Sequence, residues 1–301
     1  MKKIYLLCCL LSYLSCTFCN AQDNENIFLE QQLKGKEEEE LLHCSEEKNS
    51  ICNAVLGYAY IKGLNTGKWI AKQDNKKAEY FLSNSLSYPY SRYLLGKMIL
   101  AEVLKHGYGK VNTGISLISS ACDENVTNAC LVMSSLYEDK YKPIAINCLN
   151  SEKNKNSIYY ARKAIYSAQK YLNYLNKKGY KEEEIEKIYF IEYKKRLAYL
   201  LIKEKDKQGV DMLESLTIND ISFDGFLLAE IYEEGKIVPQ DLVKAYMYYD
   251  LRGGDNQEGK QRLSNKMTQA QIKEAVQRSW QWQERHHSYR PGYRSPEDYG
   301  F

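Results

Sequence analysis

The fold is decided by Leu227-Leu228-Ala229-Glu230-Ile231-Tyr232-Glu233-Glu234-Gly235, followed by Pro239-Gln240-Asp241 and Lys244-Ala245-Tyr246-Met247-Tyr248-Tyr249. This stretch predicts two helices joined by a short turn. Gly235 is placed to end the first helix, and Asp241 is placed to cap the second. The small residues Ala229 and Ala245 then allow close approach of neighbouring helices.

The same order of residues returns upstream and predicts a repeat array. Residues 54–86 match well with a longer loop, residues 91–137 match loosely, and residues 140–222 depart from the pattern. The corresponding residues are Gly57, Gly63, Asp74, Ala78, Gly96, Gly114 and Ser134, with Ala161 and Ala168 as small-residue candidates in the divergent part. Because such helix pairs bury their faces only against neighbours, we predict an all-α solenoid of helix-turn-helix repeats.

Four cysteines form two pairs with the same spacing. Cys44 and Cys52 lie eight residues apart, as do Cys122 and Cys130, and the pairs are separated by about two repeat periods of 36 to 40 residues. Disulfides, free buried thiols and a metal site are all compatible with this spacing, and disulfides are favoured in an exported chain. Cys148 has no cysteine at this spacing and is expected to be a buried thiol.

These residues resemble the Sel-one-like repeat, a relative of the tetratricopeptide repeat. The match is most specific at residues 227–249. In the cysteine-rich branch of the family, the resemblance implies disulfides Cys44–Cys52 and Cys122–Cys130, each joining the end of one repeat to the start of the next. The resemblance also implies protein binding. In its more specific form, it implies a protein that gives immunity against phospholipase toxins delivered by type VI secretion. Some cysteine-rich members are described as weak β-lactamases.

The N-terminus predicts export. Lys2 and Lys3 precede an apolar run that ends at Ser15, and Cys19-Asn20-Ala21 offers a cleavage site, so residues 1–21 read as a signal peptide of a periplasmic or secreted protein. Lipidation at Cys16 is the less favoured alternative. Removing the two lysines lowers the formal net charge from +3 to +1, which disfavours nucleic acid as a partner. We expect no integral membrane span.

We expect seven segments along the chain. They are a signal peptide at 1–21, an N-terminal capping helix at 22–43, disulfide-bearing repeats at 44–140, divergent long-helix repeats at 141–222, a further repeat at 223–254, C-terminal capping helices at 255–285 and a disordered tail at 286–301. Within 157–204 we expect two long helices broken at Lys178-Gly179, and within 255–285 a helix from Thr268 to Arg285. A polar end helix suits the capping role that a solenoid requires.

The sequence favours binding over catalysis. The candidate binding surface consists of Tyr58, Lys62, Lys97, Glu230 and Glu233, which lie in first helices away from the small residues. We expect the partner to be another protein, such as a toxin or an envelope protein. We expect no cofactor, metal or catalytic residue. The alternative is a β-lactamase or penicillin-binding hydrolase using Ser45 with Lys48, or Ser167 with Lys170, but its companion motifs are absent.

Overall fold

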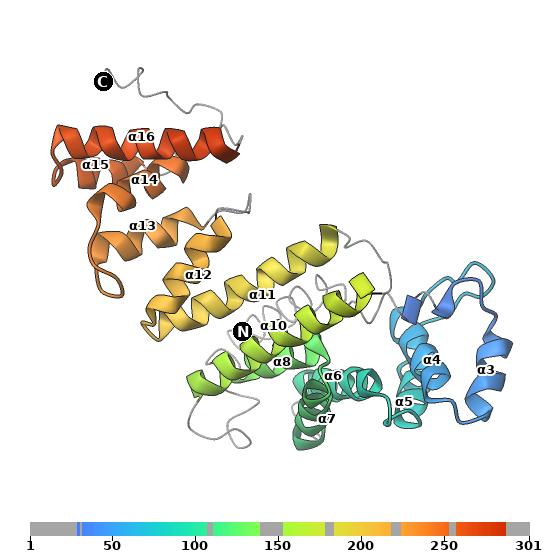
Figure 1. Cartoon of the computed structure of the whole chain (residues 1–301). Coiled ribbons are helices and arrows are strands. Elements are labelled where there is room, and N and C mark those ends of the chain that lie inside the picture. Colours follow the sequence, from blue (N-terminus) through green and yellow to red (C-terminus); the bar gives the residue numbers. More distant parts are fainter. Residues whose placement is uncertain are drawn as a thin grey trace. The chain divides into compact units, whose positions relative to one another are not determined.

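The computed structural model describes residues 29–30, 32–106, 111–138, 153–177, 184–217, 224–252 and 257–286. Within these ranges all regular elements are helices, apart from one isolated bridge between Asn65 and Ile70 (Figure 1). The helices are α3 (Glu38–Glu46), α4 (Ser50–Lys62), α5 (Asn75–Ser83), α6 (Pro89–His106), α7 (Val111–Asp123), α8 (Thr127–Leu136), α10 (Lys153–Lys177), α11 (Glu184–Lys203), α12 (Lys207–Thr217), α13 (Gly225–Glu234), α14 (Leu242–Arg252), α15 (Gln257–Ser264) and α16 (Gln269–His286). The predicted all-α fold is confirmed. The expected signal peptide, Cys16, Cys148 and nearly all of the C-terminal tail lie outside the described residues.

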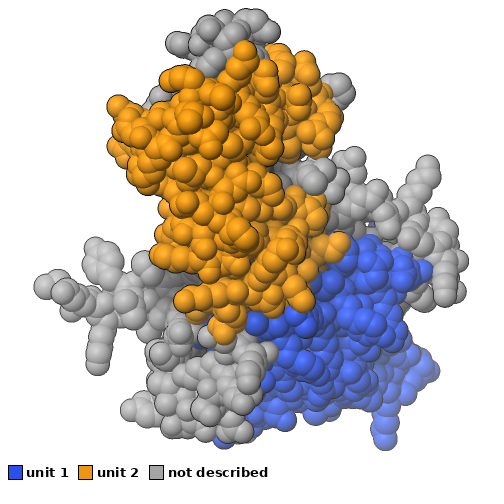
Figure 2. Space-filling view, turned by 60° about the vertical axis from the view of Figure 1, so that its left-hand side comes forward, with its two compact units in different colours: residues 1–190 blue, residues 191–301 orange. Residues whose placement is uncertain are grey.

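The chain divides into two compact units, residues 1–190 and residues 191–301, so the boundary falls inside α11 (Figure 2). Each unit has a hydrophobic core of its own. In the first unit, α4 packs on α5, α6 on α7, and α8 on α10; in the second, α13 packs on α14, which also contacts α15 and α16. The sequence repeats therefore correspond to successive helix pairs.

The pair α4 and α5 shows why the repeat residues fold in this way. Asn49 caps α4 by accepting hydrogen bonds from the backbone of Ile51 and Cys52, and Gly63 ends the helix in the left-handed region at φ 69°. Asp74 caps α5. A Cβ atom at Gly57 would lie 2.6 Å from Leu82 Cγ, so the glycine allows α4 to approach α5 closely.

Close helix pairing continues through the part of the sequence that departs from the motif. Ser134 of α8 donates a hydrogen bond to the carbonyl of Ser157 in α10, and Ser157 donates one back to the carbonyl of Ser134. In the second unit, a Cβ atom at Gly209 of α12 would lie 2.6 Å from the carbonyl oxygen of Ala198 in α11. A reciprocal pair of serines and a glycine thus keep neighbouring helices close in this part of the chain.

The last helix has the expected start and inward face. Thr268 and Gln271 form a capping box, in which Gln271 Oε1 accepts from the Thr268 backbone and Thr268 Oγ1 accepts from the Gln271 backbone. The residues of α16 that are buried are Ile272, Ala275, Val276, Ser279 and Gln283. Trp280 of the same helix is only partly buried.

Both expected disulfides are present. Cys44–Cys52 joins α3 to α4 and Cys122–Cys130 joins α7 to α8, with Cα–Cα distances of 5.9 and 4.7 Å that suit disulfide geometry. Cys122 and Cys130 are fully buried, whereas Cys44 and Cys52 are partly exposed. Each bond clamps two consecutive helices across a short connection, so the disulfides belong to the scaffold.

Candidate binding surfaces

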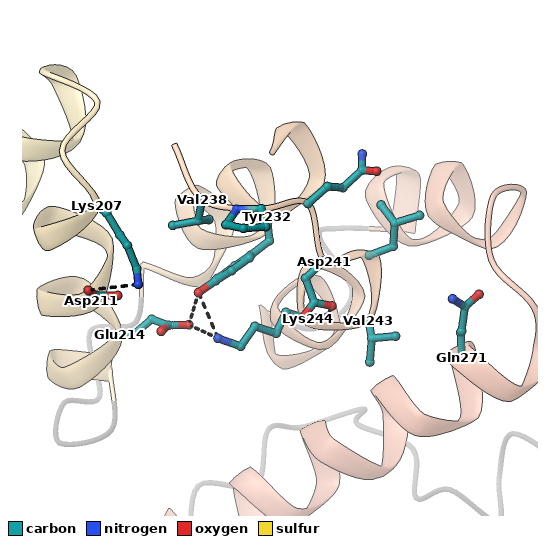
Figure 3. A pocket seen from close by; sticks show the side chains of 12 residues that line it. Lys207, Asp211, Glu214, Tyr232, Val238, Asp241, Val243, Lys244 and Gln271 are labelled. Carbon is teal, nitrogen blue, oxygen red and sulfur yellow. Dashed lines mark hydrogen bonds and ion pairs between the residues drawn. The ribbon is translucent and has the colours of Figure 1, made fainter. Parts of the chain in front are cut away.

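A charged cluster of Glu214, Tyr232, Lys244 and Tyr248 ties three consecutive helices of the second unit together. Figure 3 shows the first three of these side chains. Glu214 Oε1 accepts hydrogen bonds from Tyr232 Oη at 2.9 Å, Lys244 Nζ at 2.9 Å and Tyr248 Oη at 2.8 Å. Lys244 Nζ also donates to Tyr232 Oη at 3.0 Å and lies 4.5 Å from the centroid of that ring. The residues come from α12, α13 and α14, so the cluster fixes the register of these helices.

Burial sets the protonation of this cluster. The pKa of the Tyr248 hydroxyl is raised by its burial and by the negative charge of Glu214. Burial lowers the pKa of Lys244, but its hydrogen bonds to Tyr232 and Glu214 outweigh that effect and raise the pKa above its usual value. At neutral pH the tyrosines are therefore neutral donors, and the lysine is a cation held beside a carboxylate.

The first unit contains an equivalent cluster, in which Glu38 of α3 replaces Glu214. Tyr60 of α4 donates a hydrogen bond to Glu38. Lys77 of α5 donates to Tyr60 Oη at 3.2 Å and lies 4.8 Å from the centroid of its ring. In both units the tyrosine lies three residues after the small residue of the first helix, Gly57 or Ala229. The two clusters therefore occupy the same place in the repeat.

A partial version lies in α8 and α10, where the sequence departs from the motif. Tyr137 lies three residues after Ser134 and stacks on Tyr160 with ring centroids 5.6 Å apart. Lys163, followed by the buried Ala164, pairs with Asp123 of the preceding second helix at 2.5 Å. The pair Lys163-Ala164 therefore matches Lys77-Ala78 and Lys244-Ala245, and it fixes the repeat register within the divergent segment.

An open groove of about 580 Å³ lies beside the Glu214 cluster in the second unit. One part of its lining is charged and another is apolar, with Val238, Leu242 and Val243 contributing side chains. The full lining is Lys207, Asp211, Glu214, Tyr232, Val238, Pro239, Gln240, Asp241, Leu242, Val243, Lys244 and Gln271. Its two lysines both pair with carboxylates, Lys207 with Asp211 of the same helix at 3.9 Å and Lys244 of α14 with Glu214 of α12.

The outer face of α13 carries a different set of side chains. Phe226 is 47% exposed, and Glu230 lies one helical turn further on and is also exposed. Beside them, Glu233 pairs with Arg262 of α15 through two hydrogen bonds of 2.8 and 2.7 Å. Tyr249 donates to the same carboxylate at 3.1 Å, and the Arg262 guanidinium lies 5.9 Å from its ring centroid. This face offers an aromatic ring and a carboxylate to solvent.

The five residues expected on the binding surface differ in exposure and lie in both units. Tyr58 is 1% exposed and its hydroxyl donates to Glu30, so the expectation that it lies on the surface is wrong. Helix α4 is in contact with α3, α5 and α6, which leaves few of its side chains outside. Lys62 is exposed, and Lys97 is half-buried over the ring of Tyr93. Glu230 and Glu233 share α13, and the three others belong to the first unit.

The serine and lysine pairs of the hydrolase alternative do not form a catalytic arrangement. Lys48 lies beyond the end of α3 with φ at 60°, and Ser45 Oγ donates to Asn53 Oδ1. Ser167 is buried and donates to the carbonyl of Lys163, whereas Lys170 is exposed. Across the described ranges, no three His, Cys, Asp or Glu side chains form a group that could hold a metal ion.

Phe226, Arg262 and Glu214 were missed by sequence reasoning. Phe226 directly precedes the motif at Leu227, and an aromatic residue at the start of an amphipathic helix does not reveal which way it faces. Glu214 lies in the segment without a clear motif. A tyrosine lies three residues after Gly57, Ser134 and Ala229, and this spacing, together with the Lys-Ala pairs, is the signal that would have identified the tyrosine and the lysine of each cluster.

The comparisons with known proteins concern the fold. A protective antigen of uropathogenic Escherichia coli strains, which displays an SLR fold, is similar at 17% identity and a TM-score of 0.37, over 85% of this chain and 56% of the antigen. A Sel1 repeat protein from Oxalobacter formigenes is similar at 18% identity and a TM-score of 0.36, over 82% of this chain and 88% of that protein. The chain thus spans just over half of the antigen. Both proteins are of the repeat class that the sequence motif resembles.

No family model matches the chain, and no curated protein matches it. In the parts of the chain that the structure describes, none of the helices combines the length and apolar character needed to cross a membrane.

Proposed function

We propose that the chain is a non-enzymatic, exported repeat scaffold that binds another protein. The observation that carries this proposal is the outer face of α13. Its packing residues Leu228, Ala229 and Ile231 are buried, whereas Phe226 and Glu230 on the opposite side are exposed. Exposed aromatic and charged side chains on a rigid helix are the usual anchors of protein interfaces. The outward side chains can vary without disturbing the repeat packing.

The two disulfides support export, because such bonds persist in oxidising compartments and are rare in the cytosol. The finer form of the proposal is an immunity protein that binds and neutralises a secreted toxin, such as a phospholipase delivered by type VI secretion. Helix α13 suits this role because the core of the second unit and the Glu214 cluster hold it in place, and a preorganised surface loses little conformational entropy on binding.

The test combines capture with a protection assay. The full chain, tagged at its C-terminus and recovered from the envelope of its own cells after mild crosslinking, is expected to retain one protein in stoichiometric amount. That protein, when purified, is expected to bind in calorimetry, and cells lacking the chain are expected to lose resistance to attack by sister cells. Binding without any change in resistance would remove the immunity version, and failure to recover any binding protein would remove the scaffold proposal.

A further inference from the structure

We propose that the ring of Phe226 and the carboxylate of Glu230 together form a receptor for an arginine side chain of the partner protein. This inference rests on the proposed binding function and names the chemistry that the partner must present. Residues 226 and 230 lie one turn apart on α13, so their side chains are neighbours on its surface.

Among the described residues, several sites of the same kind hold a cation of the chain itself, as three examples show. Lys77 lies over Tyr60 beside Glu38, and Lys244 lies over Tyr232 beside Glu214. Arg262 lies near the ring of Tyr249 while pairing with Glu233. The three residue sets are Glu38, Tyr60 and Lys77; Glu214, Tyr232 and Lys244; and Glu233, Tyr249 and Arg262. Each holds a cation by an aromatic ring and a carboxylate together.

Phe226 and Glu230 have the ring and the carboxylate without the cation. Among the described residues, no lysine or arginine forms an ion pair with Glu230 or lies over the Phe226 ring. The nearby carboxylates are already matched, since Glu233 pairs with Arg262 and Glu234 pairs with Lys236 at 3.1 Å. Glu230 is therefore a carboxylate of this face that has no ion-pair partner among the described residues.

The electrostatics of Glu230 agree with this reading. Partial burial raises the pKa of Glu230, and the charges of Glu234 and Glu233 raise it further against an opposing effect of Arg262. A cation brought by a partner would stabilise the ionised form that this environment disfavours. The Phe226 ring meets Tyr249 edge to face, with centroids 5.9 Å apart, and remains 47% exposed, so a planar group can still reach it.

Arginine fits better than lysine. Unlike Tyr60, Tyr232 and Tyr249, Phe226 has no hydroxyl to share in hydrogen bonding, so the cation must be bound by the ring surface and the carboxylate alone. A guanidinium is planar, stacks on aromatic faces and can donate two parallel hydrogen bonds to one carboxylate. An ammonium is a compact and strongly hydrated charge, and it loses more hydration on binding.

The test uses the full chain labelled with ¹⁵N and three capped peptides, Gly-Arg-Gly, Gly-Lys-Gly and the neutral Gly-citrulline-Gly. We expect the arginine peptide to shift the amide resonances of α13 most strongly, the lysine peptide to do so weakly, and the citrulline peptide to have little effect. Glu230→Gln and Phe226→Leu are each expected to weaken arginine binding by about threefold or more. Both positions are exposed, and unchanged thermal unfolding would show that the variants remain folded.

Matched controls are Glu79→Gln and Tyr80→Leu, which change an exposed carboxylate and an exposed aromatic ring on α5. They are expected to leave the α13 shifts unchanged. Equal shifts with arginine and citrulline, or unchanged affinity in Glu230→Gln, would overturn the inference. If the captured partner binds wild type and both α13 variants equally, the arginine site is wrong while the scaffold function stands. If the peptide binds at α13 and no protein partner exists, the site stands and the scaffold function is wrong.

Discussion

Lys244 lies over the ring of Tyr232, 4.5 Å from its centroid, and the carboxylate of Glu214 accepts hydrogen bonds from both side chains. The lysine belongs to the second helix of a repeat, the tyrosine to the first, and the glutamate to the helix before the repeat. Because Glu38 stands in the same relation to Tyr60 and Lys77, this contact between neighbouring repeats is a recurring feature of the chain.

Removing the negative charge from the cluster is expected to destabilise the second unit. Glu214→Gln keeps the size of the side chain but weakens three hydrogen bonds, one of them from the buried Tyr248. We expect a loss of about 1–3 kcal/mol in the free energy of unfolding, measured by urea titration. Asp211→Asn, which removes only an exposed ion pair on the same helix, should cost less than about 1 kcal/mol. Equal losses in the two variants would show that the cluster has no special role.

The two disulfides are expected to react with reductant at different rates. Thiol–disulfide exchange requires access of the attacking thiolate, and Cys122 and Cys130 are fully buried whereas Cys44 and Cys52 are partly exposed. With dithiothreitol under native conditions, Cys44–Cys52 should be reduced about tenfold faster or more. Timed alkylation followed by peptide mass spectrometry measures both rates. Similar rates would mean that the first unit opens as a whole before either bond is attacked.

Gly209 is expected to tolerate no side chain. A Cβ atom there would lie 2.6 Å from the carbonyl of Ala198 and 2.8 Å from the backbone nitrogen of Ile202, so α11 and α12 would have to separate. Gly209→Ala should lower the free energy of unfolding by about 1–3 kcal/mol, although alanine favours helices. In Gly57→Ala the closest atoms belong to the Leu82 side chain, and we expect a smaller loss. Thermal unfolding of both variants provides the comparison.

Gln283 is expected to be a site where substitution stabilises the protein. Its side chain is buried in the inward face of α16, and neither amide atom has a hydrogen-bond partner among the residues that the structure describes. An unpaired buried amide costs about 1–3 kcal/mol, so Gln283→Met, which is similar in size and apolar, should raise the melting temperature. Gln281→Met on the exposed side of the same helix should change it little. A lower melting temperature for Gln283→Met would indicate that the amide has a partner after all.

Acid is expected to weaken the contact between α13 and α15. The hydrogen bonds from Arg262 lower the pKa of Glu233 in the folded protein, and partial burial opposes this only in part. Its stabilising contribution is therefore complete above the ordinary carboxyl pKa of about 4.5 and is lost as the pH falls through the lower folded value. Glu233→Gln should be less stable than wild type at pH 7, and the difference should shrink below about pH 4. A difference that does not depend on pH would contradict this assignment.

Much of the helix pairing follows from the sequence, because a few small residues determine it. Gly57, Gly63 and Gly235 lie where a side chain would crowd the neighbouring helix or where the backbone needs a positive φ, and such needs restrict the choice of residue. The disulfide pairing followed from the family resemblance.

The surface could not be predicted to the same extent. The exposure of a polar or aromatic residue in a first helix depends on how many neighbouring helices cover that helix. Tyr58 is buried, whereas Phe226 is exposed. The partners of Glu214 lie 18, 30 and 34 residues away along the chain, and no local spacing reports such contacts. An acidic and a basic residue this far apart can be predicted to pair only when the repeat register is known.

The position of Glu214 on the helix before its repeat also bears on how such a chain can be shortened or lengthened. A fragment that begins at α13 would keep Tyr232, Lys244 and Tyr248 but leave their hydroxyl and ammonium groups without the carboxylate that joins them. A fragment that begins at α12 would retain the whole set. The natural unit for excising, duplicating or grafting this part of the array is therefore a helix triplet, because the pair of α13 and α14 depends on a carboxylate of the helix before it.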